Sequence, residues 1–311
     1  PEFFDAAHVC VDRINYYPTA DVVSAERRVQ RGELDLNSTF QSNRLQHLKA
    51  AMPGYARPHL TLASYYLGFN TRDVKPLKDI RVRRALSEAI DRDFITGKLQ
   101  RAGQQPAYSF VPPGVANYAY GAQTRWARES FPERQAEART LLSQAGYGPG
   151  HSLKLEIKAP NATETLLLME AAQADWRAIG VEATIVQNEG QIAFAAYRDR
   201  DFQVGAMAWY ADFNDPMTFL SLLKSDTGAQ NYGDYKNPAY DALLAQADQE
   251  PDAARRGRTL SQAEQIMLDD EAMAPVNFIV SRSLVNPKVT GWIDNPLNFH
   301  RARWLCVKRA S

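Results

Sequence analysis

The segment from residue 206 to residue 216 carries the side chains best suited to hold a ligand. It reads AMAWYADFNDP, so small and aromatic residues run into a turn rich in acids. A carboxylate at a strand end can receive a cation, and Asp212 could pair with a ligand ammonium in a charge-assisted hydrogen bond. Three alanines would let another backbone approach closely: Ala206, Ala208 and Ala211. The composition alone favours a plainer role, a cap on the helix that begins after Pro216. Three side chains could form that cap: Asp212, Asn214 and Asp215.

Two other groups of residues could bind a ligand but have common structural roles. Tyr65 and Tyr66 point to opposite faces of a predicted strand over residues 59–70. One of them could line a pocket, although a packed aromatic ring is the commoner role. The stretch from Asp79 to Asp93 is rich in arginine and could bind phosphate. Because its charges alternate in sign, the pattern predicts a solvated helix face with ion pairs.

Charge balance and the motifs that are missing exclude several classes of function. The chain carries 36 basic and 36 acidic residues, so nothing predicts binding to nucleic acid or to an anionic membrane. The five histidines are scattered and the two cysteines lack metal-ligand spacing, so we expect no metal site. Cys10 and Cys306 could form a disulfide or remain buried thiols.

No enzyme signature is present in the sequence. It contains no Walker loop, no Rossmann glycine fingerprint, no G-x-S-x-G elbow and no H-E-x-x-H motif. We therefore expect neither catalysis nor a cofactor. A peptidase or amidase that uses Asp212 and Asp215 as acid and base stays an alternative, because sequence alone does not exclude a spatial pair of acids.

Strands and helices alternate along the chain, which predicts an α/β fold. The length of 311 residues suggests two domains. The clearest unit covers residues 153–187, where an alternating strand, a helix over 163–179 and a second strand over 182–187 follow one another. This order predicts a parallel βαβ unit with a right-handed crossover. A buried strand over 202–209 leads directly into the acidic turn, so that strand must position Asp212.

Several segments resemble, in order, the extracellular solute-binding proteins of family 5, which include oligopeptide-, dipeptide- and nickel-binding proteins of ABC importers. Residues 79–93 match that family's most characteristic helix nearly position for position. Pro1–Asp5 resembles its Asn-Pro-x-Tyr-Trp-Asp segment, and residues 30–35 resemble its Gly-Glu-Ile-Asp turn. Residues 103–114 resemble its Gly-x-x-Pro-Ala-x-x-x-x-Pro-Pro-Gly loop. Such a shared order is more specific than any single motif.

The likeness is closest to the oligopeptide-binding branch, whose Trp-Cys-Ala-Asp-Tyr-Asn-Glu-Pro run is matched by residues 209–216. In that branch the aspartate receives the α-ammonium group of the peptide, which implies this role for Asp212. The preceding strand hydrogen-bonds to the peptide, which implies the same for the backbone from Ala208 to Tyr210. The expected ligand-binding set is completed by Trp209, Tyr210, Ala211, Tyr66 and Asn277. Tyr210 replaces a cysteine and Ala206 replaces an arginine, which would reshape a side-chain pocket and remove a salt bridge.

The resemblance also implies a fold and partners. The fold would be the two-lobed periplasmic binding-protein fold (class II, cluster C), with mixed sheets and flanking helices. Residues 1–63 and 280–311 would belong to one lobe, whose N-terminal portion is absent here, and residues 64–279 would form the distal lobe. The start of the chain shows no secretory signal and reads as internal to a longer polypeptide, so a periplasmic location follows from the resemblance alone.

The implied function is the capture of short peptides by a soluble, monomeric binding protein without a cofactor. It would deliver them to the inner-membrane permease of an ABC importer. A modified peptide, such as a murein peptide or a peptide antibiotic, is an alternative ligand.

Overall fold

A seven-stranded mixed sheet runs through the computed structural model, which describes residues 5–19, 21–119 and 121–308. The strands are β1 (Leu36–Asn37), β2 (Ala56–Phe69), β3 (Gln105–Pro106), β4 (Leu153–Pro160), β5 (Val181–Asn188), β6 (Val204–Tyr210) and β7 (Met273–Val285). Their order in the sheet is β1-β7-β2-β6-β4-β5, and β3 pairs with β7. Since β6 is antiparallel to β2 but parallel to β4, the predicted α/β fold with mixed sheets is confirmed.

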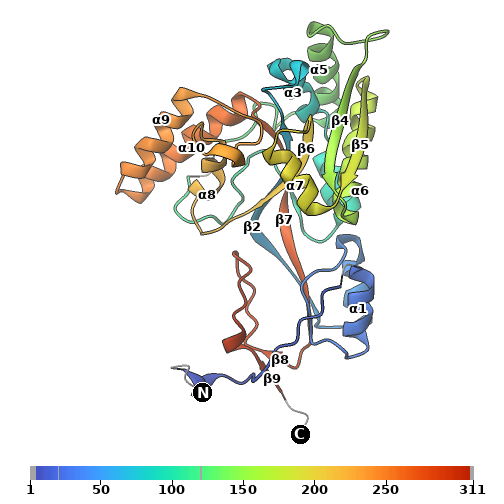
Figure 1. The fold of residues 1–311 in the computed structure, drawn as a ribbon, viewed down its shortest axis with the longest axis vertical. Helices are drawn as coiled ribbons and strands as arrows, with labels where there is room; N and C mark the ends of the chain where they lie inside the picture. The colour runs from blue at the N-terminus through green and yellow to red at the C-terminus, as the bar shows by residue number, and fades with distance from the viewer. Residues whose placement is uncertain (1–4, 20, 120, 309–311) are drawn as a thin grey trace. The chain divides into compact units, whose positions relative to one another are not determined.

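The predicted βαβ unit is present. β4 and β5 pair in parallel along their whole length, from Leu153 opposite Val181 to Pro160 opposite Asn188. α6 (Thr163–Ala178) connects them and lies beside both strands (Figure 1). The fully buried Trp176 anchors α6, because its indole N–H donates to a carbonyl of another helix, 2.8 Å away.

After residue 62, helices pack around the strands of the sheet (Figure 1). They are α3 (Ile80–Glu88), α4 (Arg92–Phe94), α5 (Phe131–Gln144), α6, α7 (Gly190–Arg198), α8 (Met217–Leu220), α9 (Pro238–Gln249) and α10 (Ala253–Asp269). Side chains cap several helix starts: Asp79 accepts a backbone N–H of α3, Asn237 caps α9 and Asp252 caps α10. α9 and α10 lie side by side next to the short α8, which begins just after the acidic turn.

The charged run from Asp79 to Asp93 was predicted correctly only in part: Arg81 and Arg84 form ion pairs with Asp79 and Glu88, but Arg92 is not on a solvated face. Arg92 is fully buried, and its guanidinium donates to the carbonyls of Ala107, Pro275 and Ser87, each at 2.9 Å. Backbone carbonyls provide acceptors for a buried guanidinium without a facing carboxylate. Alternation of charge along a helix does not report this kind of burial, and it misled the sequence-based prediction.

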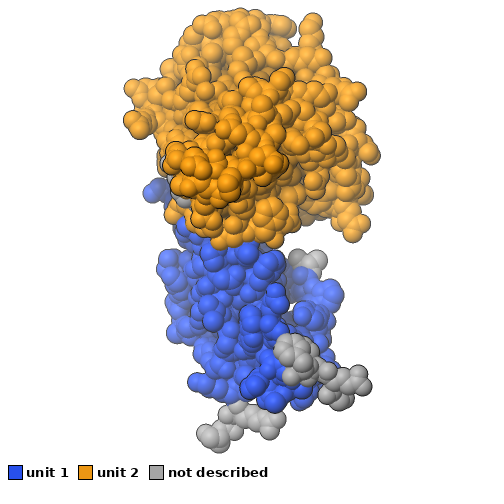
Figure 2. All heavy atoms as spheres, turned by 90° about the vertical axis from the view of Figure 1, so that its left-hand side faces the viewer, with its two compact units in different colours: residues 1–61, 96–104, 280–311 blue, residues 62–95, 105–279 orange. Residues whose placement is uncertain are grey.

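The chain folds into two compact units (Figure 2). Unit 1 comprises Pro1–Thr61, Thr96–Gln104 and Val280–Ser311, and unit 2 comprises Leu62–Ile95 and Gln105–Ile279. The assignment of residues 1–63 with 280–311 and of residues 64–279 to the lobes of a larger protein stays a prediction. The resemblance at Pro1–Phe4 lies outside the described residues.

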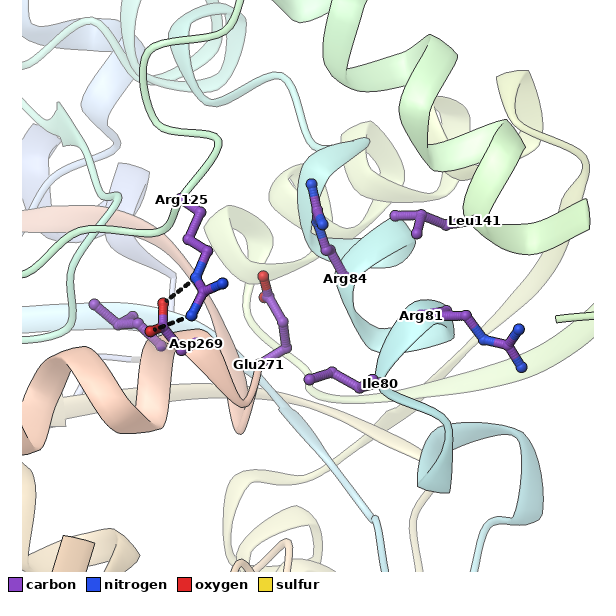
Figure 3. Close-up of a pocket in the computed structure, with 8 residues that line it drawn as sticks. Ile80, Arg81, Arg84, Arg125, Leu141, Asp269 and Glu271 are labelled. Carbon is purple, nitrogen blue, oxygen red and sulfur yellow. Dashed lines mark hydrogen bonds and ion pairs between the residues drawn. The ribbon is translucent and has the colours of Figure 1, made fainter. Parts of the chain in front are cut away.

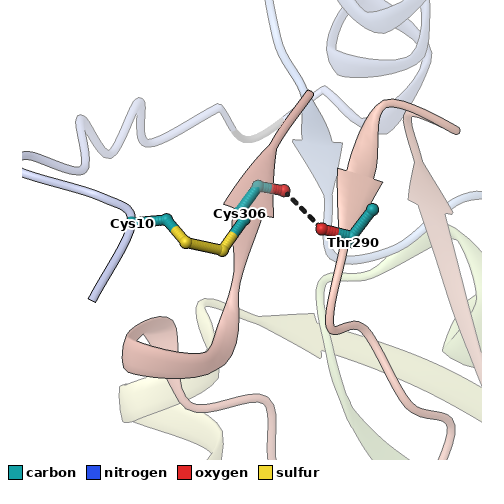
Figure 4. The surroundings of a disulfide bond; sticks show 3 residues. All are labelled: Cys10, Thr290 and Cys306. Carbon is teal, nitrogen blue, oxygen red and sulfur yellow. Dashed lines mark hydrogen bonds between the residues drawn. A yellow bond between two sulfur atoms is a disulfide. The ribbon is translucent and has the colours of Figure 1, made fainter. Parts of the chain in front are cut away.

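Unit 1 contains α1 (Val22–Gln30), α2 (Leu45–Ala51) and a two-stranded sheet of β8 (Val289–Thr290) and β9 (Cys306–Val307). A disulfide joins Cys10 to Cys306, with their Cα atoms 5.1 Å apart (Figure 4). The choice between a disulfide and two thiols, which the sequence left open, is therefore decided for the disulfide. Within the described part of the chain, no helix is long and apolar enough to cross a membrane.

Candidate functional site

β6 presents the backbone of Ala208 to one edge of the strand. β6 pairs with β2 from Val204 opposite Phe69 to Tyr210 opposite Ala63. Beyond the two ends of this pairing, the Asn70 N–H donates to the Gln203 carbonyl at 3.0 Å, and the Ala211 N–H donates to a β2 carbonyl at 2.8 Å. Backbone groups of successive residues in a strand point to opposite edges. The odd-numbered residues from 203 to 211 therefore face β2, and Ala208 directs its N–H and C=O away from it.

Pairing on that other edge is short. β4 pairs with β6 at two positions, Val204 and Gly205, which lie at the start of β6. Among residues 5–19, 21–119 and 121–308, no strand is paired with the Ala208 backbone on this edge, because the pairing with β4 ends at Gly205. A peptide in extended conformation could add there as a strand.

The acidic turn after β6 is held by contacts of its backbone and of two polar side chains. The Asp212 N–H donates to Thr218 Oγ1 at 3.1 Å, and Asn214 Oδ1 accepts from the Ala116 N–H at 2.8 Å. The Asp215 carboxylate accepts the N–H of Met217, the first residue of α8, at 2.9 Å. The same carboxylate pairs with the Arg256 guanidinium of α10, with N–O distances of 2.5 and 2.9 Å.

These contacts leave the Asp212 carboxylate unused. The residue is exposed, and its carboxylate has no hydrogen bond or ion pair with any residue that the structure describes. Of the three side chains that could have capped α8, Asp215 contacts the first N–H of the helix and Asn214 contacts another loop. A role for Asp212 in ligand binding stays a prediction, but the helix-cap alternative does not account for its side chain.

The aromatic residues that precede Asp212 lie on opposite faces of the sheet. The Tyr210 side chain is exposed, on the same face as that of Ala208. Trp209 is half-buried on the other face, and its Nε1 atom is buried without a hydrogen-bond partner in the described part of the chain. Ala211 is half-buried where the pairing with β2 ends.

Tyr66 and Asn277 lie in the core. The Tyr66 ring packs edge-on against Phe110, with ring centroids 5.1 Å apart, and burial raises the pKa of its hydroxyl. Tyr66 also lines a cavity of about 20 Å³ together with Met207, which leaves room for about one water molecule. Asn277 is 1% exposed in β7, and its Oδ1 atom has no partner among the described residues. Contact of either residue with a ligand stays a prediction.

A larger pocket of about 200 Å³, which the sequence did not predict, lies elsewhere in unit 2 (Figure 3). Its lining includes Arg81, Arg84 and Arg125, but each guanidinium already has a carboxylate partner. In Figure 3 Arg125 points at Asp269, whereas Arg81 points away from it. This pocket therefore offers no uncompensated positive charge to the phosphate that the arginine-rich run could have bound. Within the residues described, no cluster of three or more metal-ligating side chains occurs.

Comparison with known proteins gives a consistent set of relatives. The model of the bacterial extracellular solute-binding proteins, family 5 (Middle), matches residues 1–231. The chain is 32% identical over 307 residues to the periplasmic murein peptide-binding protein MppA of Escherichia coli, which covers 98% of this chain and 57% of that protein. It is 31% identical over 297 residues to the periplasmic oligopeptide-binding protein OppA of Salmonella typhimurium, which covers 94% of this chain and 54% of that protein.

Solved structures agree with the sequence comparison. The Escherichia coli murein tripeptide binding protein MppA superimposes with a TM-score of 0.92 at 31% identity, over 98% of this chain and 60% of that chain. OppA of Burkholderia pseudomallei gives a TM-score of 0.92 at 29% identity with the same coverage. The chain thus spans somewhat more than half the length of the proteins that it matches.

Proposed function

Because this chain belongs to the bacterial extracellular solute-binding proteins, family 5, we propose that it is the peptide-contacting part of a substrate-binding protein of an ABC importer. The observation that carries the proposal is the exposed Asp212 carboxylate, without a partner among the described residues, at the end of β6. The Ala208 backbone, against which no described strand is paired, precedes it by four residues.

Binding peptides of many sequences requires contacts that all peptides share. Backbone amides are satisfied when the peptide adds as a strand beside β6, with Ala208 as the pairing residue. The charged amino terminus is satisfied by the Asp212 carboxylate, and this pairing offsets the cost of removing an ammonium group from water. A carboxylate at a fixed position also sets which residue of the peptide lies opposite Ala208.

Two further observations support a periplasmic location. The relatives MppA and OppA are named as periplasmic proteins. The Cys10–Cys306 disulfide suits an oxidising compartment, since disulfides are rare in the cytosol and persist in the periplasm. Membership of this family implies the partners, a short peptide and the permease subunits of an inner-membrane importer.

A murein peptide is the second candidate ligand, and the likeness to MppA favours it. Ala206 and Tyr210, where the oligopeptide-binding branch has arginine and cysteine, lie on the same face of β6 as Ala208. The exposed ring of Tyr210 and the absence of a guanidinium at Ala206 would alter the surroundings of a ligand side chain that points to this face of β6.

A peptidase that uses Asp212 and Asp215 is disfavoured. The Asp215 carboxylate is committed to Arg256 and to the Met217 N–H, so it is not available to transfer a proton to a substrate. The relatives MppA and OppA are binding proteins, which supports binding without a chemical step.

Native mass spectrometry after incubation with a mixed pool of short peptides tests this proposal. We expect intact peptides, including murein tripeptide if the second candidate is right, to remain bound to the chain. The Asp212→Asn variant should retain much less peptide, whereas Asp248→Asn, which changes an exposed aspartate of α9, should retain the same peptides as the unchanged chain. Cleaved peptides would contradict a pure binding function, and equal retention by both variants would contradict the assigned site.

A further inference from the structure

β4 and β6 separate two residues before β4 ends, whereas β6 continues for five residues. After the paired positions Val204 and Gly205, β6 runs on to Tyr210, and β4 extends past Lys158 to Pro160. On its other side β4 stays paired with β5 over its full length. The opening between β4 and β6 therefore begins over the last two residues of β4, before the chain turns at Pro160 towards α6.

Pro160 removes the donor that the next step of pairing would need. In a parallel pair a residue bonds to the two residues that flank its opposite position. Because Ile157 lies opposite Val204, the next outward-facing residue of β6, Ala206, would pair with residues 158 and 160. Its carbonyl would accept an N–H from residue 160, which is a proline and has none.

Tyr197 of α7 supplies a donor in its place. Its hydroxyl lies 2.9 Å from the Lys158 carbonyl and 3.1 Å from the Ala206 carbonyl, and donates to both in a shared hydrogen bond. The side chain is fully buried, and burial raises the pKa of its hydroxyl, so the group stays a donor over the accessible pH range.

Packing contacts hold the Tyr197 ring at the point where β4 and β6 separate. It packs edge-on against Phe202, with ring centroids 5.4 Å apart, and beside Tyr232 at 5.8 Å. Gly205 makes room for the ring, because a Cβ atom there would lie 3.0 Å from the Tyr197 ring and 2.4 Å from the end of Met207. Residue 205 must therefore be small for the Tyr197 hydroxyl to reach both strands.

We propose that Pro160 and Tyr197 together form a stop for strand pairing, which holds β4 off β6 and keeps the Ala208 backbone available to an added ligand strand. The inference rests on the proposed function, and it makes both residues positioning residues for peptide binding. With the stop removed, the pairing of β4 with β6 would extend by two residues, and the residue 160 carbonyl, which accepts the Ala162 N–H at 2.8 Å, would accept the Ala208 N–H as well. The ligand strand is thus bounded by Asp212 at one end and by the stop at the other.

Hydrogen exchange in the chain without ligand tests the stop directly. Pro160→Ala restores the missing N–H, so the Ala208 amide should exchange at least about tenfold more slowly than in the unchanged chain. Peptide affinity, measured by calorimetry with trialanine, should fall by about tenfold or more while the unfolding midpoint stays equal or rises. A loss of affinity without a loss of stability is not expected from a residue with a merely structural role.

Tyr197→Phe and Tyr232→Phe form a matched pair, since their rings pack together and only the Tyr197 hydroxyl bridges the strands. Adding Tyr197→Phe to Pro160→Ala should change affinity and exchange little, because the restored N–H already satisfies Ala206. Tyr232→Phe should leave both unchanged.

Unaltered exchange at Ala208 in Pro160→Ala would overturn the stop, and so would slowed exchange with full affinity for trialanine. If the unchanged chain binds no peptide at all, the proposed function fails. The exchange measurement still decides whether the stop exists, because it needs no ligand.

Discussion

Asp212 differs from its polar neighbours because the fold leaves its side chain unused. The Asp215 carboxylate pairs with Arg256, and the Asn214 amide oxygen accepts the Ala116 N–H. Both side chains therefore hold the turn in place. The Asp212 carboxylate has no partner within the described ranges of the chain, although its own N–H is bonded to Thr218. A fixed backbone with a solvated carboxylate suits recognition of a cationic group, because little conformational freedom is lost on binding.

The ion pair between Asp215 and Arg256 should position Asp212 without contacting the ligand. Arg256→Met removes the guanidinium that joins the turn to α10. We expect the affinity for trialanine to fall by about three- to tenfold, since the turn becomes less ordered. The free energy of unfolding should fall by about 1–3 kcal/mol, measured by denaturant titration.

Arg255→Met is the matched control for this prediction. Arg255 lies one residue earlier in α10, and its more exposed side chain pairs with Glu250 instead. It should change peptide affinity by less than about twofold. An equal effect of the two variants on affinity would contradict a positioning role for the Asp215–Arg256 pair.

The sequence was informative at this scale for the composition of the site and less so for its contacts. The order of small, aromatic and acidic residues in 206–216 marked the strand and turn that the structure contains. It could not tell which of Asp212, Asn214 and Asp215 would remain unused, because that depends on Arg256 and Ala116, which are distant along the chain. Nor did it show that Tyr66 and Asn277 are buried.

At the scale of elements, a buried carboxylate fastens a loop to α10. Glu264 is fully buried and accepts hydrogen bonds from the Phe110 N–H at 2.6 Å, the Val111 N–H at 2.8 Å and the Tyr118 hydroxyl. Burial raises the pKa of Glu264 to about 7, and these donors only partly offset that effect. These hydrogen bonds hold loop 110–118 against α10. The same loop contains Ala116, whose N–H donates to Asn214 of the acidic turn.

This burial predicts a pH dependence of stability. The folded pKa of Glu264 lies above the ordinary value of 4.5, so the folded state binds more protons than the unfolded state between pH 4.5 and about 7. The stabilisation is complete below the unfolded pKa and is lost as the pH rises through the folded pKa. The free energy of unfolding, measured by urea titration, should therefore be lower at pH 8 than at pH 5.

Glu264→Gln should reduce this slope, because the amide is neutral at every pH and keeps one oxygen acceptor for the two backbone N–H groups. It should not abolish the slope, since burial also raises the pKa of Glu88 and of Glu271 to about 7. Glu250→Gln, at an exposed ion pair, serves as the control. A rise in the free energy of unfolding from pH 5 to pH 8 in the unchanged chain would refute this account.

The elements themselves were largely predictable, whereas their edges were not. The βαβ unit follows from alternation in 153–157 and from helical periodicity in 163–179, and the structure contains both. The early separation of β4 from β6 depends on a proline and on a tyrosine 37 residues later, whose relation appears only in three dimensions. Buried arginines such as Arg92 were missed because their partners are backbone carbonyls of other segments.

At the scale of the whole molecule, the chain matches its relatives over nearly its full length but covers little more than half of theirs. Unit 2 contains the strand, the acidic turn and the pairing stop, so the proposed peptide contacts come from a single compact unit. Unit 1 is held at its chain ends by the Cys10–Cys306 disulfide, which closes a loop with a sequence separation of 296 residues.

Loss of this disulfide should destabilise the chain. Cross-linking distant residues restricts the unfolded ensemble, and removal of a native disulfide typically costs about 2–5 kcal/mol. Cys10→Ser should lower the free energy of unfolding by this order, measured by denaturant titration under oxidising conditions. Cys306→Ser and the double variant should match it, and a reductant should destabilise only the unchanged chain. Equal stability of oxidised and reduced protein would contradict the role of the bond.

The most direct test of the account is a calorimetric comparison of two peptides against two forms of the protein. Trialanine and N-acetyl-trialanine differ in the ammonium group, and the unchanged chain and Asp212→Asn differ in the carboxylate. We predict that the unchanged chain prefers the free amino terminus by about a hundredfold, and that Asp212→Asn reduces this preference to near one. The same preference in both forms would show that the ammonium group is recognised elsewhere.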